Sequence, residues 1–198
     1  MIDPDVIVFG GSAGALDALL AILPALPQAC TTPIVVVLHL PVGQPSLVPV
    51  LLARACQRPV VEVEDKQAIR AATIYVAPPN YHVLLERSRT LALSVDPPVQ
   101  FSRPSIDVLF ESAADSCGPA VVGVLLSGAN DDGSRGLARI AQAGGRALIQ
   151  DPATAPHPTM PAAGVRLLGH AAQVASVAGL ADLIAARQGT TLHHDTAP

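Results

Sequence analysis

VIVFGGSAGAL, residues 6–16, is the stretch of sequence that decides the fold. Its first four residues, Val6 to Phe9, are apolar and predict a short strand that is buried on both faces. The glycines that follow permit a tight turn into a helix that begins at Ala15. Such a turn suits either a phosphate-binding loop, which presents backbone N–H groups, or a nucleophile elbow, which projects the side chain of Ser12 into solvent.

Apolar runs rich in β-branched residues recur along the chain and alternate with helical patterns. The other predicted strands are 34–39, 60–63, 74–76, 121–126 and 147–150, and the predicted helices are 15–23, 46–56, 105–117 and 134–143. Residues 81–95 instead contain two short apolar runs around a polar centre, which predicts an antiparallel hairpin. We therefore expect an α/β fold: a doubly wound, mostly parallel sheet with helices on both faces and an inserted antiparallel hairpin.

Length and composition favour one cytoplasmic domain. The chain has 198 residues, of which 50% are hydrophobic and 14% charged. We expect a single domain over residues 1–188 and a disordered tail over 189–198. No uncharged apolar run reaches the roughly 18 residues that a membrane span needs, so we expect no membrane insertion. Asp3 and Asp5 stand where an export signal carries positive charge, and the three widely spaced cysteines indicate reduced thiols.

The charge and the aromatic content argue against nucleic acid as a partner. The net charge is −4, the aromatic content is 3% and tryptophan is absent. The chain therefore lacks both a basic surface for phosphates and a set of stacking platforms for bases. His193 and His194 form a pair in the tail that is expected to bind only adventitious metal. A small molecule or a protein remains as the substrate.

Three polar residues follow predicted strands, at the edge where ligands bind in open parallel sheets. Ser12 follows the first strand, His39 closes the second in VVVLHLP, and Asp131 or Asp132 follows the strand VVGVLL. A serine, a histidine and a carboxylate are the parts of a hydrolytic triad, in which imidazole takes the serine proton and the carboxylate fixes its tautomer. The helix start after Ser12 would supply N–H groups to an oxyanion.

Each of these residues also has a purely structural interpretation. Ser12 would cap the helix after it, His39 would be a hydrogen-bonded histidine at a strand end, and Asp131 or Asp132 would cap the helix near Ser134. Their coincidence at one edge favours the catalytic interpretation. Nucleotide binding is disfavoured, because the glycine spacing does not fit GxGxxG and no GK[ST] follows. The order Ser, His, Asp also differs from that of the common α/β-hydrolases.

Six blocks carry a resemblance to a known family: GGSAGA, LHLP, TIYVAPPNYHVLL, SRPSIDVLF, GVLLSGANDDGSRG and AGGRALIQD. Their order and spacing resemble those of the protein-glutamate methylesterases of bacterial chemotaxis, the CheB family, over about residues 5–187. The resemblance implies that Ser12 is the nucleophile, His39 the base and Asp132 the residue that orients it, with no cofactor or metal. It also implies that methylated chemoreceptors are the partner: their glutamate methyl esters are hydrolysed to release methanol, and specific receptor glutamines are deamidated in many members.

The chain departs from the family pattern beside the implied chemistry. Ala13 stands where the family usually has a hydroxyl residue, so the oxyanion is expected to rely on the backbone N–H. In GANDDG, Ala129 replaces a methionine and Asn130 a glycine, and asparagine tolerates the positive φ that a glycine would adopt. Arg103, in SRPSID, resembles a family arginine near the site. It is expected either to hold an acidic neighbour on the receptor or to be a surface arginine before a helix that starts at Pro104.

Regulation and turnover are the two open points of the resemblance. Well-known family members carry a receiver domain and a linker before the catalytic domain, whereas this sequence starts just before its first predicted strand. We therefore expect a stand-alone or excised catalytic domain. The alternative function is a CheB-like binding module that docks a receptor without turnover. The substitutions at Ala13, Ala129 and Asn130 favour this alternative, and the intact set Ser12, His39 and Asp132 opposes it.

Overall fold

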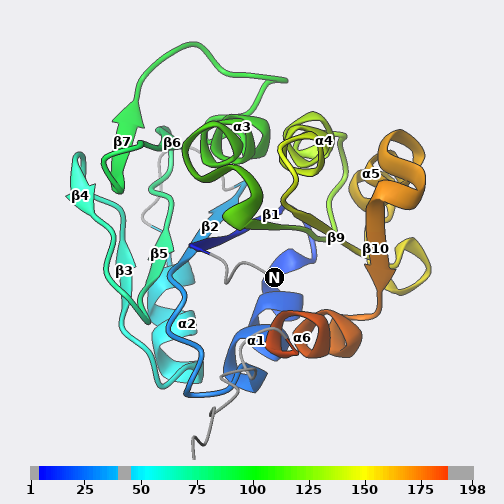
Figure 1. Ribbon diagram of the computed structural model, residues 1–198, viewed down its shortest axis with the longest axis horizontal. Helices are drawn as coiled ribbons and strands as arrows, with labels where there is room; N and C mark the ends of the chain where they lie inside the picture. Colours follow the sequence, from blue (N-terminus) through cyan, green and yellow to red (C-terminus); the bar gives the residue numbers. More distant parts are fainter. Residues whose placement is uncertain (1–4, 40–45, 187–198) are drawn as a thin grey trace, which may run out of the picture.

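A seven-stranded sheet, in which every neighbouring pair is parallel, forms the centre of the molecule (Figure 1). The computed structural model describes residues 5–39 and 46–186 of the chain. The strand order is β10-β9-β8-β1-β2-β5-β3. Its strands are β1 (Val6–Gly11), β2 (Ile34–Leu38), β3 (Val60–Glu62), β5 (Ile74–Val76), β8 (Val121–Leu125), β9 (Arg146–Gln150) and β10 (Ala172–Ala175). All of the predicted parallel strands are present, with ends that match or differ by at most two residues.

Helices cover both faces of the sheet, which confirms the predicted doubly wound fold. The helices are α1 (Ala15–Ala25), α2 (Val48–Ala55), α3 (Ile106–Cys117), α4 (Ser134–Gln142), α5 (Thr159–Leu168) and α6 (Val177–Ala185). In Figure 1, α3, α4 and α5 lie on one face, and α1, α2 and α6 on the other. Within the part of the chain that the structure describes, none of the helices combines the length and the apolar character needed to cross a membrane.

Strand β1 lies at the centre of the sheet and contributes to both cores. Val6 and Val8 pack in the core beneath α3 and α4, and Ile7 and Phe9 pack in the core beneath α1. Because both faces of the strand are buried, its sequence is continuously apolar instead of alternating. Each of these side chains stabilises the fold by roughly 1.5–3 kcal/mol through its burial.

The predicted hairpin is present and belongs to a second, antiparallel sheet. Strands β6 (His82–Leu85) and β7 (Thr90–Ser94) form the hairpin, and β4 (Gln67–Ala68) pairs with the other edge of β7. Three short 3₁₀ helices, at Gly118–Ala120, Pro152–Thr154 and Gly169–Ala171, complete the elements of the described ranges. The two-residue strand β4 was not predicted, because so short a polar segment carries no periodic pattern.

The C-terminal third departs most from the predictions. Helix α5 is absent from the predicted elements, and Pro161 is its third residue. This position is compatible with proline, because the first N–H groups of a helix have no partner within it.

Helix α1 also departs from the prediction: it continues past the predicted end at Leu23 and includes Pro24 in its last turn. The predicted tail, with His193 and His194, lies outside the described residues.

Candidate functional site

The sheet brings the three predicted residues to the carboxyl ends of adjacent strands. Gly11 of β1 pairs with Leu38 of β2, so Ser12 and His39 are the next residues on two neighbouring strands. The N–H of His39 donates a hydrogen bond to the carbonyl oxygen of Gly11 at 3.2 Å. Strand β8 flanks β1 on its other side, and the loop that contains Asp132 follows it. The edge predicted from the strand ends therefore carries the candidate site.

His39 and Asp132 are in direct hydrogen-bond contact. The Nε2 atom of His39 lies 2.8 Å from Oδ2 of Asp132, and the two side chains are 13% and 0% exposed. Asp131 is exposed, and its carboxylate makes no hydrogen bond to the residues that the structure describes. Of the two aspartates left open by the sequence, Asp132 is thus the one placed to orient the imidazole.

The first turn of helix α3 holds the carboxylate of Asp132. Its Oδ1 accepts hydrogen bonds from the hydroxyl of Ser105 at 2.9 Å and from the N–H of Asp107 at 3.1 Å, and its Oδ2 accepts one from the N–H of Ile106 at 2.8 Å. Glycine at position 10 allows this close approach, because a Cβ there would overlap the side chain of Ile106. The free N–H groups and the dipole of a helix N-terminus stabilise negative charge.

These contacts keep the buried carboxylate ionised. Burial acts to raise the pKa of Asp132, but the hydrogen bonds from His39 and from the amides of Ile106 and Asp107 outweigh it and lower the pKa below its usual value. A buried anion beside the imidazole favours the tautomer that donates to it and the imidazolium that forms when the ring takes a proton.

The lowered pKa predicts that Asp132 contributes to stability in a defined pH range. Because its folded pKa lies below its unfolded value of about 3.9, the contribution is present above that value and is lost as pH falls through the folded pKa. The difference in unfolding free energy between the parent chain and Asp132→Asn should therefore shrink below about pH 4. Urea denaturation at pH 7, 5, 4 and 3 measures it. A difference that stays constant down to pH 3 would contradict the lowered pKa.

Asp107 provides the comparison of opposite sign. Burial raises its pKa, against the opposing hydrogen bond from the amide of Gly136. A raised folded pKa means that its contribution is complete at low pH and is lost as pH rises through that pKa. In the same denaturation series, the loss of unfolding free energy caused by Asp107→Asn should therefore be larger at pH 3 than at pH 7. Asp132→Asn should show the opposite dependence on pH.

The turn that contains Ser12 is fixed to the end of strand β8. The N–H of Ser12 donates to the carbonyl oxygen of Ser127 at 2.9 Å, and the hydroxyl of Ser127 donates to the carbonyl oxygen of Ala13 at 2.8 Å. Gly14, with φ of 76°, is the N-cap residue of α1, and Gly133, with φ of 91°, is that of α4; neither cap uses a side chain. The interpretations of Ser12 as the cap of α1 and of either aspartate as the cap of α4 are therefore wrong.

Ser12 and two backbone amides are left unengaged at this edge. Within residues 5–39 and 46–186, the half-buried Ser12 hydroxyl makes no hydrogen bond, and the N–H groups of Ala13 and Ala129 have no acceptor. The imidazole nitrogen of His39 that does not contact Asp132, Nδ1, has the hydroxyl of Ser102 at 3.5 Å. The structure thus joins His39 to Asp132, and places Ser12 beside them without a direct side-chain bond to His39.

Arg103 is hydrogen-bonded within the chain, and the helix expected directly after it begins later. Helix α3 begins at Ile106, not at Pro104, so Arg103 does not directly precede it. Its guanidinium donates to Oδ1 of Asn80 at 2.7 and 3.1 Å, and to the carbonyl oxygens of Val95 and Asp96 at 2.8 and 3.1 Å.

Asn130 does not adopt the positive φ that its family counterpart suggested. Its side-chain oxygen instead accepts a hydrogen bond from the N–H of Asp132 at 3.3 Å, which supports the loop around the buried aspartate. A short polar side chain that bonds to the backbone two residues further on is a common way of forming a turn.

Three residues of the site were missed from the sequence. Ser105, in SRPSID, was taken only as the start of a helix, and its hydroxyl in fact holds Asp132. Ser127 fixes the Ser12 turn, and no local pattern marks it. The buried His82 accepts the N–H of Ser105 on Nδ1 at 3.1 Å and donates from Nε2 to the carbonyl oxygen of Pro97 at 3.2 Å. Through these two contacts, His82 supports the start of α3.

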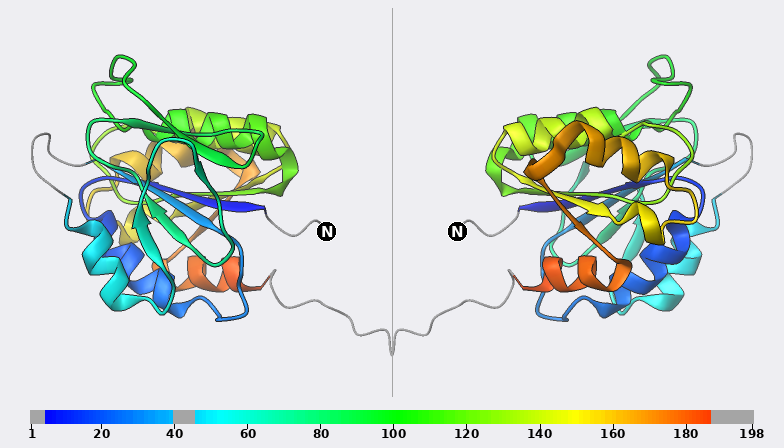
Figure 2. Two further views of the ribbon diagram at one scale, coloured as in Figure 1. Left: turned by 90° about the vertical axis from the view of Figure 1, so that its left-hand side faces the viewer. Right: turned by 90° about the vertical axis from the view of Figure 1, so that its right-hand side faces the viewer.

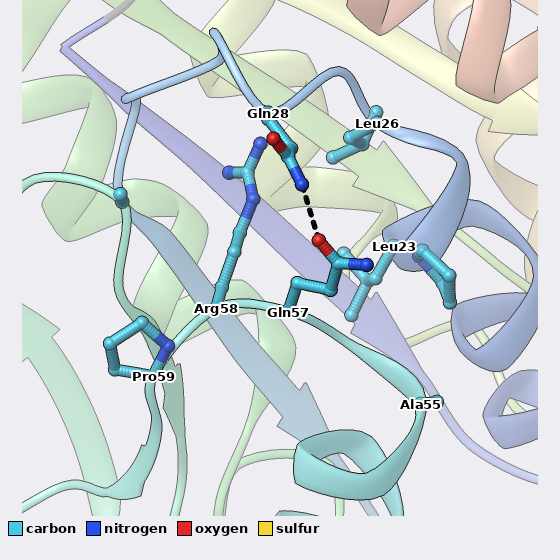
Figure 3. A pocket seen from close by; sticks show the side chains of 9 residues that line it. Leu23, Leu26, Gln28, Ala55, Gln57, Arg58 and Pro59 are labelled. Atoms are coloured by element: carbon cyan, nitrogen blue, oxygen red, sulfur yellow. Dashed lines mark hydrogen bonds between the residues drawn. The ribbon is translucent and has the colours of Figure 1, made fainter.

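A cavity of about 540 Å³ lies away from this edge (Figure 3). It is lined by the C-terminal ends of α1 and α2 and by the segment before β3, among them Leu23, Ala55 and Pro59. The side chain of Gln28 donates to that of Gln57 across it. Because these segments lie at the amino ends of the parallel strands, the cavity contains none of the predicted site residues and takes no part in the candidate site.

Comparison with known proteins agrees with this architecture. Residues 7–184 match the family described as CheB methylesterase. A crystal structure of the Thermotoga maritima CheB methylesterase catalytic domain superposes with a TM-score of 0.86 and 25% sequence identity, covering 93% of this chain and 99% of that one. The observed fold is thus that of a CheB catalytic domain.

Curated relatives are also similar in sequence. A Leptospira interrogans protein, whose name gives methylesterase and glutaminase activities, is 43% identical over 161 residues, which are 81% of this chain and 83% of that protein. The protein-glutamate methylesterase/protein-glutamine glutaminase of group 3 operon from Bradyrhizobium diazoefficiens is 36% identical over 149 residues, 74% of this chain but 41% of its own length. The chain therefore belongs to the CheB methylesterase family.

Proposed function

We propose that the chain is a serine hydrolase that removes methyl esters from glutamate side chains of chemoreceptors and releases methanol. The observation that carries the proposal is the 2.8 Å contact between His39 and the buried, ionised Asp132, at the strand edge that also presents Ser12. Family membership and the names of the relatives support methylated glutamate as the substrate. The methylated chemoreceptor is then the partner, and the steps require neither a metal nor an organic cofactor.

The first half of the proposed reaction forms an acyl-enzyme. The oxygen of Ser12 attacks the ester carbonyl carbon while its proton passes to His39, on the ring nitrogen that does not contact Asp132. The tetrahedral oxyanion takes hydrogen bonds from the amides of Ala13 and Ala129, which have no other acceptor in the described part of the chain. Collapse of this intermediate breaks the bond to the methoxy oxygen, which leaves as methanol with the proton from His39.

The second half regenerates the serine. A water molecule attacks the acyl carbon as His39 takes its proton, and the bond to Ser12 breaks with return of that proton to the serine oxygen. The products are the free enzyme and a glutamic acid side chain, which releases its remaining proton to solvent and becomes a carboxylate. The same steps acting on a glutamine side chain would release ammonia, so we propose protein-glutamine deamidation as a second reaction of this site. Because Ala13 offers no hydroxyl, the oxyanion relies on backbone donors alone.

Labelling with a serine-reactive fluorophosphonate tests the proposed nucleophile. The purified chain should form a single adduct on the peptide that contains Ser12, as read by mass spectrometry, because only an activated serine reacts rapidly. The adduct should be lost in His39→Ala and retained in His170→Ala, which removes an exposed histidine remote from the strand edge. Absence of an adduct at every serine would rule out the hydrolase and leave a receptor-binding module.

A further inference from the structure

The segment between β7 and α3 projects beyond the rest of the fold (Figures 1 and 2). Within this segment, Val99 and Ser102 exchange two backbone hydrogen bonds of 3.1 and 2.9 Å. The two residues between them, Gln100 and Phe101, have φ of 47° and 64°. Two-residue turns of this kind normally use asparagine or glycine, because side chains disfavour positive φ. Phe101 is nevertheless present, and the residue is fully exposed, at 104%.

This turn is fixed beside the candidate site. The side-chain amide of Gln100 donates from Nε2 to Oδ2 of Asp107 at 3.2 Å, which connects this turn to the first turn of α3. Ser102, the residue after Phe101, has its hydroxyl 3.5 Å from Nδ1 of His39. Consecutive Cα atoms are about 3.8 Å apart, so the backbone of Phe101 lies next to the residues around the imidazole. The aromatic ring is therefore displayed to solvent from an anchored position at the mouth of the site.

Two further exposed side chains lie on segments joined to this turn. Val95 is 68% exposed and Tyr81 is 40% exposed. Arg103 holds the three segments together, because it bonds to Asn80, which precedes Tyr81, and to the carbonyl oxygen of Val95. We call Tyr81, Val95 and Phe101 the apolar rim. Because the Arg103 guanidinium is already hydrogen-bonded to Asn80 and Val95, we expect the apolar rim to bind a partner by apolar contact and not through an ion pair.

The position of Ser12 brings the backbone of a protein substrate close to this rim. Asp132 is fully buried and Ser12 is half-buried, whereas the carbonyl carbon of a glutamyl ester lies only about 4 Å from its own Cα. The backbone that carries the ester must therefore approach the mouth of the site closely. Exposed aromatic side chains at such a position commonly act as binding anchors, because they bury a large apolar area at low entropic cost.

We infer that the apolar rim is the docking surface for the substrate protein, with Phe101 as its anchor. The occupant is the receptor segment that carries the methylated glutamate, so the inference rests on the proposed function. We expect the apolar rim to keep its conformation on docking, because the hydrogen bonds of Gln100 and Arg103 already fix its segments. Phe101 acts in binding the protein substrate and takes no part in the bond-breaking steps.

Phe101→Asn tests this inference, since asparagine tolerates the positive φ and preserves the turn. Binding is measured with methylated cytoplasmic fragments of chemoreceptors and a chain carrying Ser12→Ala, so that no turnover interferes. Adding Phe101→Asn should raise the Kd by about tenfold or more. Adding Leu167→Gln, which removes an exposed leucine from α5, should leave the Kd unchanged. With Ser12 present, Phe101→Asn should raise KM for demethylation by a similar factor while kcat changes little.

The outcomes separate this inference from the proposed function. An unchanged Kd and KM in Phe101→Asn, with an unchanged melting temperature, would overturn the docking role even if demethylation is observed. Weakened binding without any turnover by the parent chain would support docking and overturn the hydrolase. If Phe101→Asn loses affinity only for phosphatidylcholine vesicles and not for the receptor fragments, the rim contacts lipid and the inference fails.

Discussion

Ser12→Ala is expected to lower kcat for demethylation of a chemoreceptor fragment by about 10⁶-fold, the scale of losing the nucleophile of a serine hydrolase. Without the hydroxyl, the proposed acyl-enzyme cannot form, and His39 has no proton to accept from residue 12. The substitution should leave the melting temperature nearly unchanged, because the Ser12 side chain makes no hydrogen bond to the described residues. Alanine at this position also fits a turn whose sharpness comes from Gly14.

Release of methanol from a receptor fragment with methyl-labelled glutamates measures this effect. Ser127→Ala is a useful companion, since it keeps the nucleophile but removes the hydroxyl that holds the carbonyl oxygen of Ala13. It should retain measurable turnover with a lower melting temperature. If Ser12→Ala demethylates the fragment at the parent rate, another residue is the nucleophile, and the proposed mechanism is wrong.

If Asp132 orients His39 as proposed, Asp132→Asn is expected to lower kcat by about 10⁴-fold, the scale for serine-hydrolase triads that lose this carboxylate. The neutral amide no longer favours the donating tautomer of His39, and it no longer stabilises the imidazolium. This variant should also lose stability, by about 1–3 kcal/mol, because three donors of the first turn of α3 lose a charged acceptor. Kinetics should therefore be measured well below its melting temperature.

Asp131→Asn is the matched control for this prediction. The neighbouring carboxylate is exposed and makes no hydrogen bond to the described residues, so both kcat and stability should stay close to the parent values. The ratio of the two rates isolates the effect of position from the effect of removing one negative charge from the loop. A larger loss in Asp131→Asn than in Asp132→Asn would show that the loop is positioned differently during turnover.

The fold was predictable wherever local pattern and tertiary environment agree. The runs at Val6–Gly11 and Ile34–Leu38 are buried on both faces, so their continuous apolar character reports their place in a parallel sheet. Strand β10, with the sequence AQVA, lies at an edge of the sheet and is only partly buried. Its residues carry no distinctive pattern, and its pairing with β9 determines its conformation. Long-range pairing of this kind leaves no local signal.

The candidate site divides in the same way. Ser12, His39 and an aspartate were predictable, because residues after parallel strands gather at one edge whatever the details of packing. The choice between Asp131 and Asp132 was not, since it depends on which carboxylate the first turn of α3 reaches. That turn lies 25 or more residues away along the chain, and its approach depends on the absence of a side chain at Gly10.

The sequence by itself determined the doubly wound architecture, the edge that carries the site and the residue types gathered there, because strand periodicity and strand order follow from local composition. Only the tertiary structure decided which aspartate is ionised against His39, that Ser105 and Ser127 support the site, and that Phe101 is displayed at its mouth. These features depend on burial and on hydrogen bonds between segments distant in sequence, and such contacts exist only after the sheet and its helices have assembled.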